Sequence, residues 1–210
     1  MNAPERLQAD LVTQCAAAFN RPVRPEVRAE QLAGRTVVVV RVDEAAAADK
    51  PVFLKTLGLP RGLTAGTGMD ALAHCLEAYC SPFYHPMGEG IAVEGIRLVK
   101  ENLVRAFKDG TDIEARAHMM SAAAMGATAF QKGLGAIHAL SHPVGALYDT
   151  HHGMTNAVFM PYVLQFNRAA IEAKIVRLAA YIGLAPTFEA FMAWIIDLRK
   201  QLGVPHTLKD

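Results

Sequence analysis

Apolar residues recur every three or four positions over most of the chain after residue 60, which is the spacing of one face of an α-helix. Short segments containing proline or glycine separate these apolar stripes. The stripes consist of Ala92, Ile96, Val99, Leu103 and Ala106; Ile113, Ala117, Met120, Ala124 and Ala127; Ile171, Ile175, Leu178 and Ile182; and Phe188, Phe191, Ile195, Leu198 and Leu202. The pattern predicts an all-α bundle over residues 64–208.

The first 60 residues have a different pattern. Residues 35–43 read RTVVVVRVD, and a run of β-branched valines favours a strand over a helix. Residues 50–55 predict a second short strand, and residues 5–19 fit a helix. We therefore expect a mainly α protein with two parts, a short N-terminal α/β fragment over residues 1–60 and a helical domain over residues 61–210.

Composition and charge exclude several classes of protein. Lys and Arg total 21 and Asp and Glu total 20, so the net charge of +1 gives no general attraction to nucleic acid or to acidic membranes. No apolar run approaches the roughly 20 residues of a membrane span, and the N-terminus lacks the pattern of a signal peptide. Three cysteines without a CxxC motif indicate a reducing environment, so we expect a cytoplasmic protein.

The first candidate chemistry lies in the segment GTGMDALAHCLEAY, where Asp70 and His74 are four residues apart. On a helix both side chains project from one face, one turn apart, where they can bind a single metal ion. The same spacing also occurs on ordinary solvated helix faces, and an acid near a helix N-terminus is favoured by the helix dipole. The pair alone leaves both interpretations open.

A histidine cluster gives the metal interpretation more weight. His138, His142, His151 and His152 fall within fifteen residues, beside apolar neighbours. Burying imidazoles without partners is costly, and metal coordination is a common solution. One carboxylate with three imidazoles suits Fe(II), Zn(II) or Ni(II).

Local signals around the histidines predict how the helices begin and end. We expect Pro143 to kink or restart its helix, residues 151–153 to form a loop, and Thr155 or Asn156 to cap the next helix. Glu77 and Glu94 either orient an imidazole or, as is more common for glutamate, are solvated.

Two separated signatures resemble those of the iron-containing (group III) alcohol dehydrogenases. They are GLTAGTGMDALAHCLEAY at residues 62–79 and GLGAIHALSHPVGALYDTHHGMTNAVFMPYVLQFN at residues 133–167. The resemblance covers about residues 57–208. It implies a helical bundle like the C-terminal, metal-binding domain of the dehydroquinate-synthase-like fold, which in this family follows an α/β domain that binds the nicotinamide cofactor.

The resemblance also implies roles for individual residues. The metal ligands would be Asp70, His74, His138 and His152, and His142 would be catalytic, near the nicotinamide, as a candidate proton relay. The implied cofactors are Fe(II), with Zn(II) as the alternative, and NAD(P). The implied reaction is hydride transfer between NAD(P) and a small alcohol or aldehyde, and homo-oligomerisation is left open.

The N-terminal part departs from the family. Only about 60 residues precede the first signature, and the family's glycine-rich phosphate loop is absent, so no cofactor-binding residue is assigned. Residues 21–55 are instead similar to part of the Schlafen/Alba-type DNA-binding domains, although we expect ordinary solvated arginines there rather than nucleic-acid binding. We expect a truncated or chimeric chain.

Other functions remain open. The chain could be a non-catalytic, metal-binding helical remnant, in which the same ligands bind an ion without redox activity. Alternatively, it could be a member similar to maleylacetate reductase or glycerol dehydrogenase.

Overall fold

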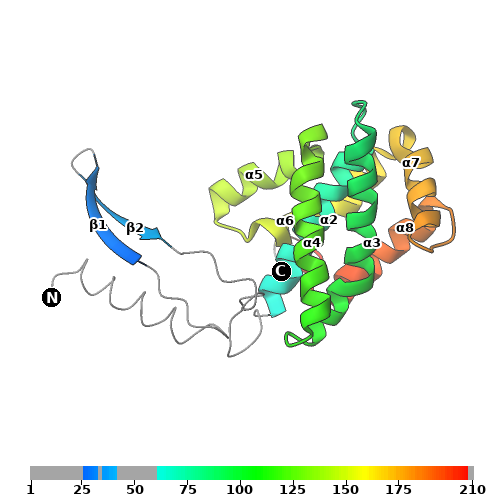
Figure 1. Cartoon of the computed structure of the whole chain (residues 1–210). Coiled ribbons are helices and arrows are strands. Elements are labelled where there is room, and N and C mark those ends of the chain that lie inside the picture. Colours follow the sequence, from blue (N-terminus) through cyan, green and yellow to red (C-terminus); the bar gives the residue numbers. More distant parts are fainter. Residues whose placement is uncertain (1–25, 33–34, 42–60, 208–210) are drawn as a thin grey trace. The chain divides into compact units, whose positions relative to one another are not determined.

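The computed structural model describes residues 26–32, 35–41 and 61–207, in two compact units, Met1–Leu59 and Pro60–Asp210. In the first unit, β1 (Glu26–Leu32) and β2 (Arg35–Arg41) form an antiparallel pair in which Glu26 lies opposite Arg41 (Figure 1). Strand β2 confirms the valine-rich prediction. Strand β1 was not predicted, because its sequence EVRAEQL has no run of β-branched residues. The helix predicted at residues 5–19 and the strand predicted at residues 50–55 lie outside the described residues.

The described part of the second unit contains seven α-helices and one 3₁₀-helix, which confirms the mainly α prediction. Figure 1 shows α2, α3 and α4 side by side, with α5 on one side of them and α7 and α8 on the other, and α6 contacts α2, α5, α7 and α8. None of the described helices is long and apolar enough to cross a membrane. The elements are α2 (Arg61–Cys80), α3 (Pro86–Lys108), α4 (Ile113–Ala129), η2 (Phe130–Lys132), α5 (Ala136–Tyr148), α6 (His152–Phe166), α7 (Arg168–Tyr181) and α8 (Phe188–Gln201).

The core forms around α2, which contacts α3, α4, α5, α6 and α7. Three of the four predicted stripes are buried against it or against each other, namely those of α3, α7 and α8. In α8, for example, Phe188 is almost completely buried, and Phe191 and Ile195 are completely buried. For these helices the spacing of large apolar residues was enough to identify the inward face.

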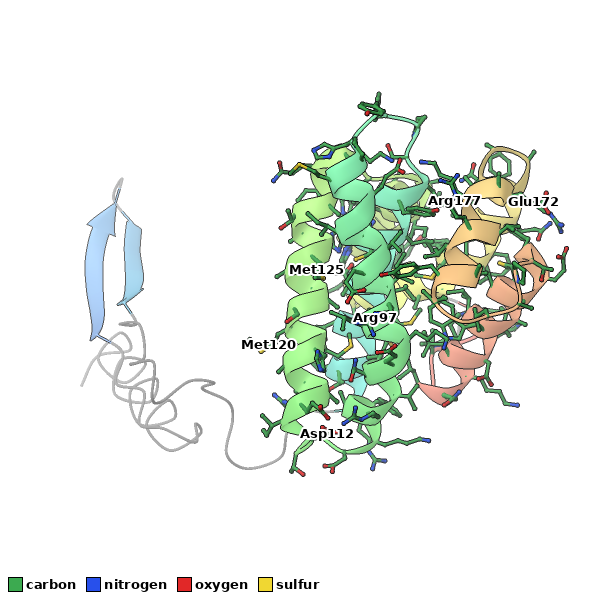
Figure 2. The ribbon with its side chains drawn as sticks, turned by 45° about the vertical axis from the view of Figure 1, so that its right-hand side comes forward. Arg97, Asp112, Met120, Met125, Glu172 and Arg177 are labelled. Carbon is green, nitrogen blue, oxygen red and sulfur yellow. The ribbon has the colours of Figure 1, made fainter. Side chains whose placement is uncertain are left out.

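The stripe predicted for α4 is wrong. Ile113 and Met120 are exposed, Met120 by 68% (labelled in Figure 2), whereas Ala122 and Gly126 are buried. Helix α4 is rich in alanine on every side, so its apolar spacing fits more than one face. The buried face is the one whose small residues allow α2 to approach: a Cβ on Gly126 would lie 3.0 Å from Cβ of His74 and 3.2 Å from the carbonyl oxygen of Ala71.

Substituting leucine at two alanines of α4 tests this corrected face. Ala122 is 0% exposed, so we expect Ala122→Leu to overpack the core and lower the free energy of unfolding by about 1–3 kcal/mol. Ala124, half a turn away, is exposed, so Ala124→Leu should change it by no more than about 0.5 kcal/mol. Urea unfolding of both variants measures the difference, and a larger loss for Ala124→Leu would contradict the assignment.

Candidate metal centre

The helices that carry the candidate ligands are held together by a close contact between α2 and α6. A Cβ on Gly153, in the first turn of α6, would overlap the carbonyl oxygen of Gly66 on α2, so only glycine allows the two main chains to approach this closely. Asp70 lies one turn after Gly66, and His152 precedes Gly153 directly. The contact therefore places the carboxylate of Asp70 beside the ring of His152.

Three of the predicted ligands converge in this region. Oδ1 of Asp70 lies 3.4 Å from Nε2 of His138 and 3.3 Å from Nε2 of His152, and all three atoms lie within 4.8 Å of one another. Atoms bound to one tetrahedral Zn²⁺ at 2.0–2.2 Å lie about 3.4 Å apart. The donor types and their spacing therefore fit a single divalent ion. We refer to Asp70, His138 and His152 as the ligand cluster.

His74 borders the ligand cluster, but none of its atoms belongs to the converging set. Its ring centroid lies 4.5 Å from that of His138. Its Nδ1 lies 3.0 Å from the main-chain oxygen of Asp70, an acceptor, so Nδ1 carries the hydrogen and Nε2 of the neutral ring keeps its lone pair. His74 thus has the tautomer of a ligand and lies next to the other candidates.

His142 lies on the outer side of the cluster. Its ring stacks on that of His152 at a centroid distance of 5.3 Å and meets the edge of His138 at 5.7 Å. The side chain is exposed, as is appropriate for a group that exchanges protons with solvent. No role was predicted for His151. Its side chain caps α6 by accepting a hydrogen bond from the main-chain nitrogen of Met154.

The structure differs from the local expectations around the histidines. Helix α5 does not restart at Pro143, because the carbonyl that Pro143 leaves without a donor belongs to Ala139, an exposed position where water can replace the missing hydrogen bond. Residues 151–153 do not form a loop, since α6 begins at His152. Thr155 and Asn156 are consequently buried inside α6 and do not cap it.

Glu77 orients His138, the less common of the two interpretations considered for it. It is 7% exposed, and its Oε2 lies 2.6 Å from Nδ1 of His138 while its Oε1 accepts a hydrogen bond from the main-chain nitrogen of Ile137. A carboxylate at Nδ1 fixes the tautomer that presents Nε2 to a metal. The signal was in the sequence, because Glu77 is seven residues after Asp70 and therefore on the same helix face. Glu94 instead pairs with Arg97.

The opposite charges in the cluster shift its ionisation. Burial raises the pKa of Asp70, but hydrogen bonds from His138 and Asn156 and electrostatic interactions with His74 and His152 outweigh burial, and the pKa falls below its usual value. Burial lowers the pKa of His138, but the bonds to Asp70 and Glu77 outweigh it and raise the pKa to about 9. Without an ion, His138 therefore carries the proton that a metal has to displace.

Asn156 was missed as a functional residue. It is 0% exposed, and its Nδ2 lies 2.7 Å from Oδ1 of Asp70, 3.2 Å from Nε2 of His138 and 3.1 Å from Nε2 of His152. Its position four residues after His152 on α6 was the available signal, because that spacing puts both side chains on one face.

Gly153→Ala tests whether the contact between α2 and α6 builds the site. We expect the added methyl group to separate the helices, to lower the free energy of unfolding by about 1–3 kcal/mol and to weaken the binding of Zn²⁺. Gly90→Ala is the control, since Gly90 is an exposed position of α3 where a Cβ meets nothing within 4 Å, and it should stabilise the protein by about 0.5–1 kcal/mol. Thermal unfolding and calorimetric titration provide the two readouts; unchanged Zn²⁺ affinity in Gly153→Ala would refute the contact's role.

Glu77→Gln tests the orientation of His138. The amide has only one acceptor oxygen for the two donors that Glu77 now serves, so the imidazole loses the fixed tautomer. We expect Zn²⁺ affinity to fall about 10- to 100-fold, as is usual when an outer partner of a metal-bound histidine is lost. Glu94→Gln, the same substitution on α3, should leave the affinity unchanged. Equal affinities in the two variants would show that Glu77 does not orient the ligand.

Comparison with known proteins agrees with the fold and with the chemistry of the cluster. The C-terminal domain of the Fe-containing alcohol dehydrogenase family matches residues 64–210. A 4-hydroxybutyrate dehydrogenase of Cupriavidus necator is 45% identical over 164 residues, which are 74% of this chain and 43% of that protein. A 1,3-propanediol dehydrogenase of Klebsiella pneumoniae is 38% identical over 165 residues, or 75% of this chain and 43% of that protein.

Solved structures show the same helical arrangement. A 1,3-propanediol oxidoreductase superimposes with a TM-score of 0.70 at 38% identity, covering 73% of this chain and 42% of that one. An alcohol dehydrogenase from Oenococcus oeni gives 0.68 at 32% identity, covering 72% of this chain and 42% of that one. These matches confirm the predicted bundle.

The matches cover only part of the relatives and only part of this chain. The chain spans less than half the length of these relatives. The family match does not include residues 21–55, so their similarity to the Schlafen/Alba-type domains stays a prediction. Over residues 64–210, the chain belongs to the Fe-containing alcohol dehydrogenase family, as its C-terminal domain.

Proposed function

We propose that this chain provides the metal-binding half of an NAD(P)-dependent alcohol dehydrogenase that interconverts a small alcohol and its aldehyde or ketone. The observation that carries the proposal is the convergence of Asp70, His138 and His152, with Glu77 behind His138. Relatives that act on 4-hydroxybutyrate, 1,3-propanediol and methanol support a short-chain hydroxyl substrate.

Asp70, His74, His138 and His152 are the proposed ligands. His74 is the fourth because its Nδ1 is committed to the main chain and its ring adjoins His138. Mixed oxygen and nitrogen donors suit Fe(II), with Zn(II) as the alternative. A reducing compartment, for which we propose the cytoplasm, would keep iron ferrous and the free thiols of Cys75 and Cys80 reduced.

In the proposed reaction the alcohol loses its hydroxyl proton and passes a hydride from carbon to NAD(P)⁺, giving the carbonyl product, NAD(P)H and one proton. The bound ion would supply Lewis acidity toward the hydroxyl oxygen. Asp70, His74, His138 and His152 would bind the ion, and Glu77 would keep His138 oriented. His142, exposed and stacked on His152, is placed to carry the released proton to solvent.

We propose that the cofactor is held outside the described residues. The sheet that the described residues form has two antiparallel strands, whereas a dinucleotide site needs a strand, a glycine-rich loop and a helix. The side chain of His152 is 42% exposed and that of His138 is 2% exposed, so the ligand cluster is accessible from the His152 side. We propose that substrate and cofactor approach from that side.

A second candidate is a helical module that binds metal without catalysing hydride transfer. It is favoured by one observation: all four proposed ligands and Glu77 come from α2, α5 and α6 of one compact unit. The same four ligands would serve, and the ion would only stabilise the fold.

Metal analysis and an activity assay separate the two candidates. We expect the purified chain to bind one Fe(II) or Zn(II), and Asp70→Ala and His138→Ala to weaken binding more than about 100-fold, beyond the effect of losing an outer partner. Asp197→Ala and His118→Ala are matched controls on α8 and α4 and should bind normally. NADH or NADPH oxidation with a small aldehyde would support the dehydrogenase. A bound ion without oxidation would show that this chain by itself binds metal without catalysing hydride transfer, and no ion bound would refute both.

A further inference from the structure

The amide nitrogen of Asn156 lies within hydrogen-bond distance of one candidate ligand atom from each residue of the ligand cluster. Asn156 lies on α6, Asp70 on α2 and His138 on α5, so one side chain connects the three helices that form the site. Its Nδ2 approaches each ligand atom to between 2.7 and 3.2 Å. Because Asn156 is completely buried, water does not compete with these contacts.

The orientation of the amide follows from what it faces. A carboxylate oxygen accepts hydrogen bonds more strongly than a neutral nitrogen, and the contact with Asp70 is the shortest of the three. The amide oxygen, Oδ1, is buried and has no hydrogen-bond partner. Exchanging the two amide atoms would turn that oxygen toward the carboxylate oxygen of Asp70, and two acceptor oxygens repel each other. The unpartnered oxygen is therefore the consequence of directing the donor at Asp70.

We propose that Asn156 is a positioning residue of the metal centre, whose amide N–H holds the carboxylate of Asp70 beside His138 and His152. The inference rests on the proposed metal-binding function of the cluster. Asp70 has a second restraint within its own helix, the ring of His74, but Asn156 is the group that ties it to α6. Without the amide, the carboxylate would lose its hydrogen bond to α6 and keep only its contacts with His74 on α2 and His138 on α5 as such restraints before an ion binds.

Asn102 offers a matched control for substituting Asn156. It is also a buried asparagine, 3% exposed, on α3, and its Nδ2 donates to the main-chain oxygen of Leu98 at 2.9 Å. Asn102→Ala removes the same atoms from the core without touching the ligand cluster. Any general effect of losing a buried amide should appear in both variants.

Titration with Co²⁺, whose visible absorption reports the number and type of its ligands, tests the proposal. We expect Asn156→Ala to bind Co²⁺ about 10- to 100-fold more weakly than the unmodified chain, with absorption bands at the same wavelengths because the ligands are the same. Asn102→Ala should bind Co²⁺ normally even if its melting temperature falls. Asn156→Ser keeps a shorter hydroxyl donor, so its Co²⁺ affinity should lie between that of Asn156→Ala and that of the unmodified chain. It replaces Asn156→Ala in the test if Asn156→Ala does not fold.

Three results would overturn the inference. Unchanged affinity in Asn156→Ala would show that the amide positions nothing, and tighter binding would show that it only occupies space an ion needs. Shifted absorption bands would make Asn156 a ligand rather than a positioning residue. If the unmodified chain binds no Co²⁺, the proposed metal function fails as well; if it binds Co²⁺ and Asn156→Ala matches it, this inference alone fails.

Discussion

The main-chain contact between α2 and α6 determines where a metal site can form in this protein. Gly153 allows the backbone of α6 to touch the backbone of α2 at Gly66, and this brings Asp70 and His152 within 3.3 Å of each other although they are far apart in the sequence. Larger residues would force the helices apart, and the helical bundle cannot compensate, because α2 is packed against its other neighbours as well. The close packing of α2 and α6 is therefore a precondition for the proposed metal site.

Electrostatic pairing offsets the cost of burying the ligands. A buried carboxylate or imidazolium is unfavourable alone, but Glu77, His138 and Asp70 alternate in charge through the site. The arrangement holds His138 between two acids, which is why its pKa rises to about 9 although burial opposes this. A divalent ion that displaces the proton of His138 would be attracted by the carboxylates of Asp70 and Glu77, and would bind an imidazole whose tautomer Glu77 already fixes. The same contacts therefore stabilise the metal-free site and prepare it for an ion.

The sequence predicted those features that depend on local spacing. The four-residue interval between Asp70 and His74 and the stripes of α3, α7 and α8 were readable because large or polar side chains mark one helix face. Prediction from apolar spacing failed for α4. This helix has alanine on all sides, so its buried face is determined by how closely it can pack against α2. Prediction also failed at residues 151–156, since the start of α6 depends on His151 as a cap, and the contacts of Asn156 arise only when α2, α5 and α6 come together.

Metal binding and hydride transfer impose different requirements on the chain. All of the proposed ligands, together with Glu77 and Asn156, come from α2, α5 and α6 of one compact unit, so the proposed metal site lies entirely within this unit. Hydride transfer also needs a nicotinamide held against the substrate carbon, because proximity and orientation supply much of the rate. The exposure of His152 leaves the cluster open on one side for such a partner. The two functions are therefore separable in physical terms, and metal affinity, rather than turnover, is the property that reports directly on the residues of this helical unit.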